Sequence, residues 1–269
     1  MRYFVGIENR AYHHWQIELL IESFRMLKMD ERLIIGVGDC DPGPEPFDIR
    51  NLVGHKNKIA HEQQQAHSLY AMIAALENGI LTQPFAYIHP DMLMVKPLVL
   101  DDENSNITYH KINYPDEKME ITRKLFSDKL PWLSMGGVVV FQNTPMSYFY
   151  AAWNRAKQFL EKAENAPFMR HCDPIRGGLI AAFYDHSKTL NAQASYFEST
   201  LWHYNLDHAC FLHYRHGLPP LFSKTHYYKI PGEVILLADK DPYKVLLNNN
   251  PTLATNYMHS VIRSYKGIK

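Results

Sequence analysis

Cysteine is scarce in this sequence and irregularly placed. Three cysteines occur among the 269 residues, Cys40, Cys172 and Cys210, and long stretches of chain separate them. Such a small, odd and scattered set argues against a disulfide framework and against a zinc site built from thiolates. We therefore expect a protein of a reducing compartment, whose polar chemistry depends on other side chains.

An excess of charge of either sign is also absent. Lysine and arginine together number 28, and aspartate and glutamate together number 28. A balanced chain generates no long-range field that would attract nucleic acid or an acidic membrane surface. A local basic patch is still compatible with this composition, because the balance describes only the whole chain.

Long apolar runs are missing as well. No segment approaches the roughly 18 uninterrupted apolar residues of a membrane span, and the amino terminus lacks the apolar core and cleavage site of a signal peptide. Hydrophobic residues still make up 46% of the chain and aromatic residues 13%, which is ample for a packed core. With no repeat or linker in view, we expect a cytoplasmic protein of a microbe or virus, without a membrane partner, folded as a single domain over residues 1–269.

What the sequence does contain is an alternation of strand and helix patterns. Apolar or β-branched runs predict strands at 3–7, 33–37, 85–88, 136–141, 209–212 and 234–237, with a weaker alternating pattern at 106–112. Apolar residues at helical spacing predict helices at 13–28, 61–78, 145–164, 173–183 and 251–265. Strands separated by helices of this length predict parallel βαβ units, and therefore an α/β fold with a mostly parallel sheet flanked by helices.

The stretch 85–97 interrupts an apolar run with a short polar step. Residues 85–88 are expected to form a buried strand, and His89 and Asp91 follow at its carboxyl end. In an open α/β sheet ligands bind at that end, and a carboxylate there can ligate a divalent ion that also holds a diphosphate. Asp91 is therefore a candidate metal ligand. A plain turn is the structural alternative, because Pro90 and Asp91 both favour turns.

A second polar cluster follows the strand predicted at 209–212. This strand would deliver His213 at its end, and imidazole is a common metal ligand. Gly217 and Lys224 come next, where a closely approaching backbone and a cation would suit a diphosphate. An incidental surface position for His213 is the alternative, since the chain contains 15 histidines.

Two further positions stand at the starts of predicted elements. Gly136 and Gly137 open a β-branched strand, where the backbone can approach a ligand closely, although a bend at the strand start explains the pair equally well. Asp173 precedes Pro174 at the beginning of a predicted helix. Its local pattern is that of a helix cap followed by a first-turn proline.

Together these segments resemble the nucleotide-sugar-dependent glycosyltransferases of the GT-A fold. The likeness comprises an early strand and helix, an Asn-Lys pair before a helix, a strand ending in an acidic motif, a Met-Gly-Gly strand and a late His-Tyr strand followed by glycine and lysine. Within this group the chain resembles peptidyl hydroxyproline arabinosyltransferases and related enzymes. The motifs that carry this likeness are Tyr12-His13-His14-Trp15-Gln16, Asn57-Lys58, His89-Pro90-Asp91-Met92, and Asp173 ahead of Ala181-Ala182.

The resemblance implies a Rossmann-like GT-A sheet, with a nucleotide-binding half up to about residue 100 and an acceptor half beyond it. It implies that Asp91 and His213 bind manganese or magnesium, which neutralises the diphosphate of a nucleoside-diphosphate sugar, in particular a UDP-sugar. His89 stands where the family has the first acid of its Asp-x-Asp motif, and it either ligates the ion or contacts the ribose. The resemblance also implies phosphate binding by Lys58 and Lys224, a nucleoside pocket of Glu8, Asn9 and Asp39, and a carboxylate near the transferred sugar at Asp173. Further residues expected to contact the donor are Asn57, Gly136, Gly137 and Gly217.

The acceptor hydroxyl has two candidates. One is a bacterial surface-glycan precursor. The other is a hydroxymethylated base of viral DNA, whose phosphates would contact Arg215, His216, Arg263, Lys266 and Lys269, although an ordinary solvated surface explains those residues as well. Two other classes stay open: an inactive sugar-nucleotide-binding module, because a histidine replaces an acid, and an unrelated hydrolase of phosphate esters.

Overall fold

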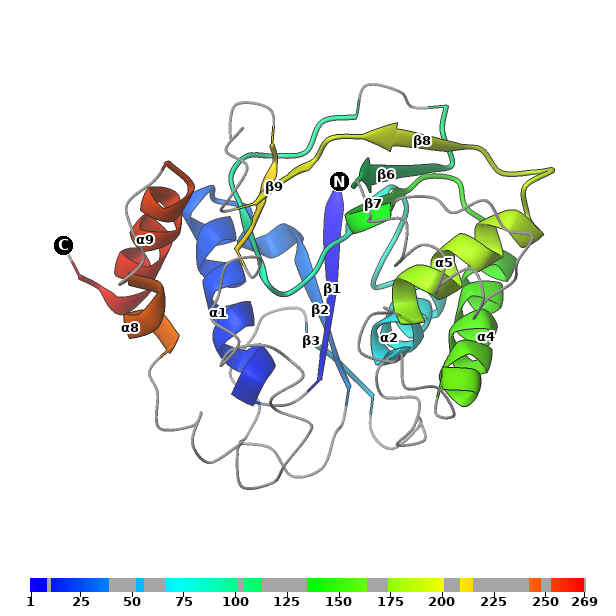
Figure 1. Cartoon of the computed structure of the whole chain (residues 1–269), viewed down its shortest axis with the longest axis horizontal. Helices are drawn as coiled ribbons and strands as arrows, with labels where there is room; N and C mark the ends of the chain where they lie inside the picture. The colour runs from blue at the N-terminus through cyan, green and yellow to red at the C-terminus, as the bar shows by residue number, and fades with distance from the viewer. Residues whose placement is uncertain are drawn as a thin grey trace.

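The computed structural model describes residues 1–8, 11–38, 52–55, 66–100, 104–112, 135–163, 174–200, 209–214, 242–247 and 253–268. Within these residues the chain forms a large mixed sheet, a small second sheet and helices on both faces of the large sheet (Figure 1). This is an α/β fold, as the alternation of strand and helix patterns predicted.

The large sheet has the strand order β3-β2-β1-β4-β7-β6-β8. Its strands are β1 (Arg2–Glu8), β2 (Leu33–Gly38), β3 (Leu52–His55), β4 (Phe85–Tyr87), β6 (Ile107–Lys111), β7 (Met135–Phe141) and β8 (Ala192–Ser195). Neighbouring strands are parallel, except that β7 runs antiparallel to β4 and to β6. The prediction of a mostly parallel sheet is confirmed, and the carboxyl ends of β1, β2 and β4 point to one edge.

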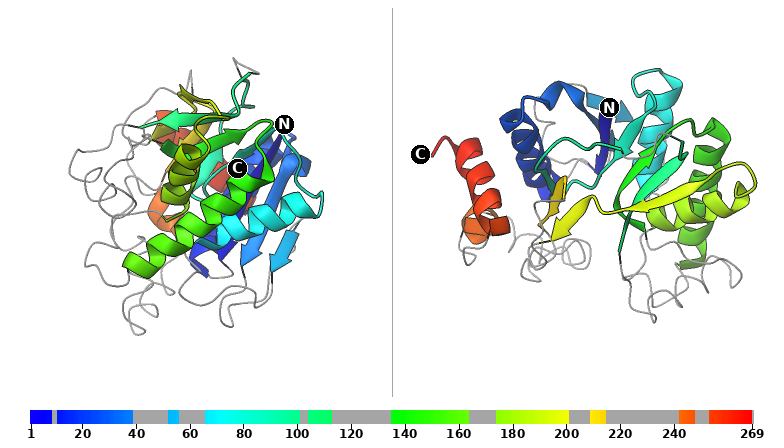
Figure 2. Two further views of the ribbon diagram at one scale, coloured as in Figure 1. Left: turned by 90° about the vertical axis from the view of Figure 1, so that its right-hand side faces the viewer. Right: turned by 90° about the horizontal axis from the view of Figure 1, so that it is seen from above.

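Helices cover both faces of this sheet. α1 (Ala11–Met26) lies on one face, and α2 (His67–Glu77), α4 (Met146–Ala163) and α5 (Pro174–Asp185) lie on the other (Figure 1; Figure 2). α8 (Pro242–Leu247) and α9 (Leu253–Lys266) pack outside α1, and a short 3-10 helix, η1 (Asp30–Arg32), leads into β2. Among the described residues, no helix has the length and apolar character needed to cross a membrane.

The alternation of side chains along β1 divides the core into two clusters. Tyr3 and Val5 belong to the cluster on the α1 side, whereas Phe4 belongs to the cluster on the α2 side. Gly6 on the second side lets α2 pack directly on the strand, because an added Cβ would lie 2.4 Å from the Cβ of Ser68. Both faces of the sheet are therefore buried, which agrees with the continuous apolar runs in the sequence.

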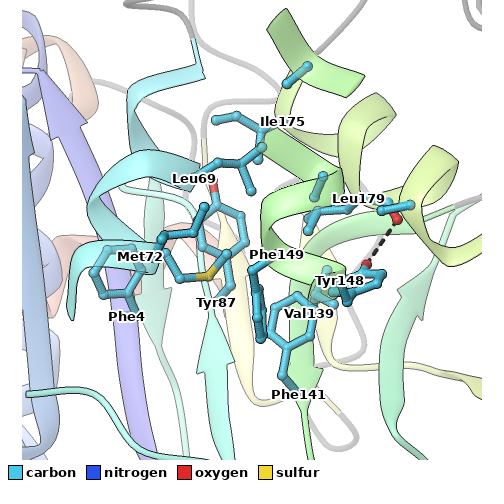
Figure 3. Close-up of a cluster of buried hydrophobic side chains, with 14 of the residues drawn as sticks. Phe4, Leu69, Met72, Tyr87, Val139, Phe141, Tyr148, Phe149, Ile175 and Leu179 are labelled. Carbon is cyan, nitrogen blue, oxygen red and sulfur yellow. Dashed lines mark hydrogen bonds between the residues drawn. The ribbon is translucent and has the colours of Figure 1, made fainter. Parts of the chain in front are cut away.

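Aromatic rings fill the space between the sheet and helices α4 and α5 (Figure 3). Phe141 of β7 meets Phe149 of α4 edge to face with ring centroids 5.1 Å apart, and Tyr148 meets Phe149 in the same way at 5.4 Å. The hydroxyl of Tyr148 donates to the carbonyl of Leu179 at 2.9 Å, which joins α4 to α5. Tyr148 and Phe149 are thus part of the core, whereas Tyr150 of the same helix is 42% exposed.

The small sheet has the order β5-β10-β9. β5 (Met92–Met94) is antiparallel to β10 (Phe211–His213), and β9 (Glu198–Thr200) is parallel to β10. Met92 and Phe211 are buried in the α1-side cluster together with Tyr3. The strand predicted at 209–212 is observed as β10 in this second sheet, where its backbone pairs with β5 and β9.

The predicted elements agree with the observed ones to within a few residues wherever both are described. The helix predicted at 61–78 is observed at His67–Glu77, with residues 61–65 outside the described part, and Gly79 follows it with a φ of +67°. β3, β5, β8, β9, α8 and the short η1 were not predicted. The strand predicted at 234–237 lies outside the described residues.

Candidate metal centre

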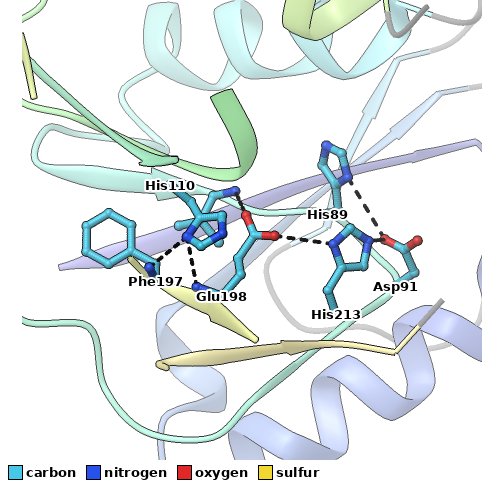
Figure 4. A network of polar contacts seen from close by, with 7 residues as sticks. His89, Asp91, His110, Phe197, Glu198 and His213 are labelled. Carbon is cyan, nitrogen blue, oxygen red and sulfur yellow. Dashed lines mark hydrogen bonds and ion pairs between the residues drawn. The ribbon is translucent and has the colours of Figure 1, made fainter. Parts of the chain in front are cut away.

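Two strands of the small sheet bring Asp91 and His213 together. His213 pairs with Met92 in the antiparallel register of β10 and β5, so the start of β5 lies beside the end of β10. The backbone N–H of Tyr214 donates to the carbonyl of Asp91 at 3.3 Å, which extends the pairing by one residue. As a result, Nε2 of His213 lies 3.2 Å from Oδ1 of Asp91 (Figure 4).

His89 approaches the same point from the end of β4. Its Nδ1 lies 4.0 Å from Oδ1 of Asp91, and its ring is nearly perpendicular to that of His213, with centroids 5.9 Å apart. One ligand atom from each of His89, Asp91 and His213 lies within 4.8 Å of the other two. The side chain of His89 is 17% exposed, against 4% for Asp91 and 8% for His213, so His89 is the most accessible of the three.

A carboxylate that the sequence did not single out lies behind His213. Glu198 begins β9 and pairs with Phe211, so its side chain and that of His213 share one face of the small sheet. Its Oε2 lies 3.3 Å from Nδ1 of His213, and its Oε1 accepts a hydrogen bond from the N–H of Val138 at 2.7 Å. His213 therefore has a carboxylate at each ring nitrogen.

His110 of β6 supports the backbone that carries Glu198. Its Nδ1 accepts hydrogen bonds from the N–H groups of Phe197 and Glu198 at 2.9 and 3.2 Å (Figure 4). An accepting Nδ1 carries no hydrogen, so this ring is neutral with its hydrogen on Nε2. Burial lowers the pKa of His110, which is consistent with that state. Neither His110 nor Glu198 has a sequence signal beyond a polar residue in a short strand.

The two carboxylates determine the charge of His213. Burial acts to lower the pKa of His213, but the charge of Asp91 and the hydrogen bonds with Asp91 and Glu198 raise it from 6.5 to about 9. Burial acts to raise the pKa of Glu198, but its hydrogen bond with His213 lowers it from 4.5 to about 2. Without a metal ion, His213 is therefore an imidazolium between two carboxylates at neutral pH.

Gly136 and Gly137 of β7 lie directly against this group. A Cβ on Gly136 would lie 2.6 Å from the ring of His110 and 2.7 Å from Oε1 of Glu198. A Cβ on Gly137 would lie 2.4 Å from the terminal methyl of Met92 and 3.1 Å from Nδ1 of His89. The two glycines thus make room for side chains of the polar cluster, and contact with a bound phosphate stays a prediction.

Most of the other predicted donor contacts lie outside the described residues. Glu8 ends β1 beside Gly38 of β2, so the chain ends that lead to Asn9 and Asp39 are neighbours. The predicted residues for which the structure gives no placement are Asn9, Asp39, Asn57, Lys58, Asp173, Gly217 and Lys224.

The basic residues suggested for DNA phosphates are described only in part. Arg263 and Lys266 lie in the last turn of α9, and the ammonium group of Lys266 lies 4.1 Å from the ring centroid of Tyr243. Lys266 is thus engaged in a cation–π contact within the protein. Arg215, His216 and Lys269 lie outside the described residues.

The donor set of the cluster fits a divalent ion. Two imidazole nitrogens and one carboxylate oxygen suit first-row divalent metals, and three protein ligands leave coordination positions for oxygen atoms of another molecule. Metal-bound histidines are commonly held by a carboxylate on the other ring nitrogen, which is the relation of Glu198 to His213. His89, Asp91 and His213 could therefore hold a metal ion.

Comparison with known proteins gives similarities of structure alone. No protein-family model matches the chain, and no curated protein matches it. A glycosyltransferase involved in the glycosylation of the major capsid of PBCV-1 is similar over 81% of this chain and 93% of its own, at 12% identity and a TM-score of 0.46. The galactosyltransferase LgtC, in complex with donor and acceptor sugar analogues, is similar over 91% of this chain and 98% of its own, at 12% identity and a TM-score of 0.45.

A further similar structure is that of the bifunctional glycosyltransferase WbbM, over 91% of this chain and 50% of its own, at 11% identity and a TM-score of 0.44. At such identities and scores these likenesses carry no argument about chemistry.

Proposed function

We propose that this chain is a metal-dependent glycosyltransferase, which moves a sugar from a nucleoside-diphosphate donor, a UDP-sugar, to a hydroxyl acceptor. The observation that carries the proposal is the convergence of His89, Asp91 and His213 after the end of β4, with ligand atoms within 4.8 Å of one another. The carboxyl ends of strands are where α/β sheets bind ligands. The sequence likeness to GT-A enzymes implies that a metal ion at such a site binds the diphosphate of the donor.

The ion would be held by His89, Asp91 and His213. Bound there, a divalent ion supplies positive charge that stabilises the diphosphate leaving group. Two imidazoles favour manganese over magnesium, because magnesium prefers a shell of oxygen ligands. By the same sequence likeness, Lys58 and Lys224 bind the phosphates, and Glu8, Asn9 and Asp39 bind the nucleoside. Asn57, Gly136, Gly137 and Gly217 are further proposed contacts of the donor.

Asp173 is our candidate for the carboxylate near the transferred sugar. It immediately precedes Pro174, the first residue of α5. Burial lowers the pKa of Arg176 in the first turn of this helix, while the charges of Glu198 and Asp91 act to raise it. Arg176 is therefore within the electrostatic influence of Glu198 and Asp91. The role of Asp173 itself rests on the sequence likeness alone, because Asp173 lies outside the described residues.

Of the two acceptors, we favour a hydroxyl of a surface-glycan precursor over a base of DNA. The chain has equal numbers of acidic and basic residues. Lys266, one of the five residues suggested for DNA phosphates, is engaged with the ring of Tyr243. Both facts weaken the case for a surface that binds a polyanion.

The proposal is tested by thermal unfolding in the presence of nucleoside diphosphates and nucleotide sugars, each with and without manganese. A ligand that binds only the folded protein stabilises it by about 2.7 kcal/mol at a concentration one hundred times its dissociation constant. For a chain of this size that amounts to a shift of several degrees. We expect a shift with uridine nucleotides that requires manganese.

Two variants and one control make this test specific. Asp91→Ala and His213→Ala should lose the manganese-dependent shift and all metal-dependent turnover. Asp185→Ala, which breaks only an exposed ion pair with Arg155, should keep both. No shift with any nucleotide would refute the proposal, binding without turnover would favour an inactive binding module, and donor hydrolysis without transfer would favour a hydrolase.

A further inference from the structure

Glu198 is a buried carboxylate for which the proposed reaction has no direct use. Its side chain is 4% exposed, and both of its oxygens are engaged. Oε1 accepts from the N–H of Val138 at 2.7 Å, and Oε2 lies 3.3 Å from Nδ1 of His213. Burying a carboxylate is costly unless its hydrogen bonds are satisfied, so this arrangement calls for an explanation in terms of what it does to His213.

An ionised carboxylate can only accept hydrogen bonds. The hydrogen between Glu198 and His213 must therefore lie on Nδ1 of the imidazole. A neutral imidazole has a single N–H, so Nε2 then presents its lone pair on the opposite side of the ring. That side faces Oδ1 of Asp91 at 3.2 Å, which is where the cluster would hold an ion.

Three contacts determine where the carboxylate of Glu198 lies. The N–H of Val138 binds one oxygen, and Nδ1 of His110 accepts the N–H groups of Phe197 and Glu198. Gly136 leaves the space that both side chains need, since a Cβ there would lie within 2.7 Å of each. Glu198 is thus attached to β6 and β7 of the large sheet, while His213 belongs to the small sheet.

We propose that Glu198 is a positioning residue of the metal centre, which holds His213 in the tautomer with hydrogen on Nδ1 and so keeps Nε2 available to a divalent ion. The inference rests on the proposed metal site. It adds that the site needs a fourth side chain, one that does not itself contact the ion. Loss of a partner of this kind typically weakens metal binding by about 10-fold to 100-fold.

Glu198→Gln is the variant that tests it, because an amide has nearly the same shape but a single acceptor oxygen. If that oxygen keeps the N–H of Val138, the amide NH₂ faces His213, and the hydrogen of the imidazole must move to Nε2, where the ion would bind. If the amide turns over, a buried N–H of Val138 faces a donor, which is also unfavourable. In either orientation the amide cannot accept from both the N–H of Val138 and Nδ1 of His213, as the carboxylate does.

The measurement is the affinity of the full chain for Mn²⁺ alone, from the paramagnetic resonance signal of the free ion. We expect wild type to bind and Glu198→Gln to bind about 10-fold to 100-fold more weakly. Asp185→Asn is the matched control, since it also replaces a hydrogen-bonded carboxylate, and should bind like wild type. Equal affinities of wild type and Glu198→Gln would overturn the positioning role alone, whereas no binding by wild type would overturn the metal site and the proposed function with it.

A second measurement needs no variant. Wild-type protein with nitrogen-15 in its histidine rings is loaded with Zn²⁺ as a diamagnetic probe, and the ring nitrogens of His213 are assigned by nuclear magnetic resonance. We expect hydrogen on Nδ1 and metal on Nε2. Metal on Nδ1 or hydrogen on Nε2 would overturn the proposal even if Glu198→Gln failed to fold.

Discussion

Asp91 and His213 lie with Oδ1 and Nε2 only 3.2 Å apart because the first residues of β5 face the last residues of β10. Without an ion this contact is a hydrogen-bonded ion pair, since the pKa of His213 is raised despite burial by Asp91 and Glu198. The same two atoms would have to ligate a metal. A proton and a metal ion therefore compete for Nε2, which leads to two of the following predictions.

Binding of Mn²⁺ should strengthen as pH rises. Burial lowers the pKa of His213, but Asp91 and Glu198 raise it to about 9, so each ion must displace the Nε2 proton at neutral pH. We expect affinity to increase about tenfold per pH unit between about pH 6.5 and 8.5, with nearly one proton released per ion. Calorimetry in buffers of different ionisation enthalpy measures both quantities, and affinity that is independent of pH would contradict the competition.

The metal-free protein should lose stability as it is made alkaline. The folded pKa of His213, about 9 after the carboxylates overcome burial, lies above its ordinary 6.5, so its contribution is complete below pH 6.5 and is lost as pH rises to about 9. The loss is on the order of 3 kcal/mol. Urea unfolding in the presence of a chelator measures it, and His213→Gln, which lacks the titrating group, should show a smaller decline over the same pH range.

The stabilising contribution of Glu198 should be lost in acid rather than in alkali. Burial acts to raise its pKa, but the hydrogen bond with His213 lowers it to about 2 from an ordinary 4.5. Its stabilising contribution is therefore present above about pH 4.5 and is lost as pH falls toward 2. Urea unfolding between those values should decline more steeply for wild type than for Glu198→Gln. Equal slopes would show that the carboxylate does not gain its hydrogen bond on folding.

Alanine at the two site glycines should have unequal effects. At Gly136 the new Cβ meets the ring of His110 and the carboxylate of Glu198, both held by hydrogen bonds, whereas at Gly137 it first meets the flexible end of Met92. We expect Gly136→Ala to destabilise by about 1–3 kcal/mol and to weaken Mn²⁺ binding, with Gly137→Ala milder in stability. Gly79→Ala is the control: its φ of +67° strains the backbone, but it should leave metal affinity unchanged.

The hydrogen bond between α4 and α5 should be measurable on its own. Tyr148→Phe removes a buried hydroxyl that donates to the carbonyl of Leu179 at 2.9 Å. We expect a loss of about 1 kcal/mol in the free energy of unfolding, with metal affinity retained. Tyr150→Phe is the matched control, because the hydroxyl of Tyr150 bonds to Glu77 on the surface. Its effect should stay below about 0.5 kcal/mol.

The sequence predicted the strands and helices whose pattern is strong in itself. β1, β2, β4 and β7 are buried on both faces, so they read as continuous apolar runs. β8 has no such run, because Gln193 and Ala194 are exposed, and β9 is only three residues long. A polar edge strand and a very short one leave no periodicity to detect.

The sequence predicted only those residues of the candidate site that stand next to a segment with a strong apolar pattern. His89, Asp91 and His213 each stand beside an apolar strand, and that local signal marked them. Glu198 has no local signal, because its role depends on the register of β9 with β10 and on the N–H of Val138 in β7. Such long-range pairing cannot be inferred from one segment at a time.

The small sheet joins two distant parts of the chain, with β5 at Met92–Met94 in one and β9 at Glu198–Thr200 and β10 at Phe211–His213 in the other. During synthesis β1, β2 and β4 can emerge and pair while β10 is still inside the ribosome. A nascent chain that ends before His213 therefore has the start of the sheet but no second imidazole for an ion. The three side chains of the metal centre would therefore come together only after β10 has emerged and paired with β5, so a chain still in synthesis before that point would lack the centre.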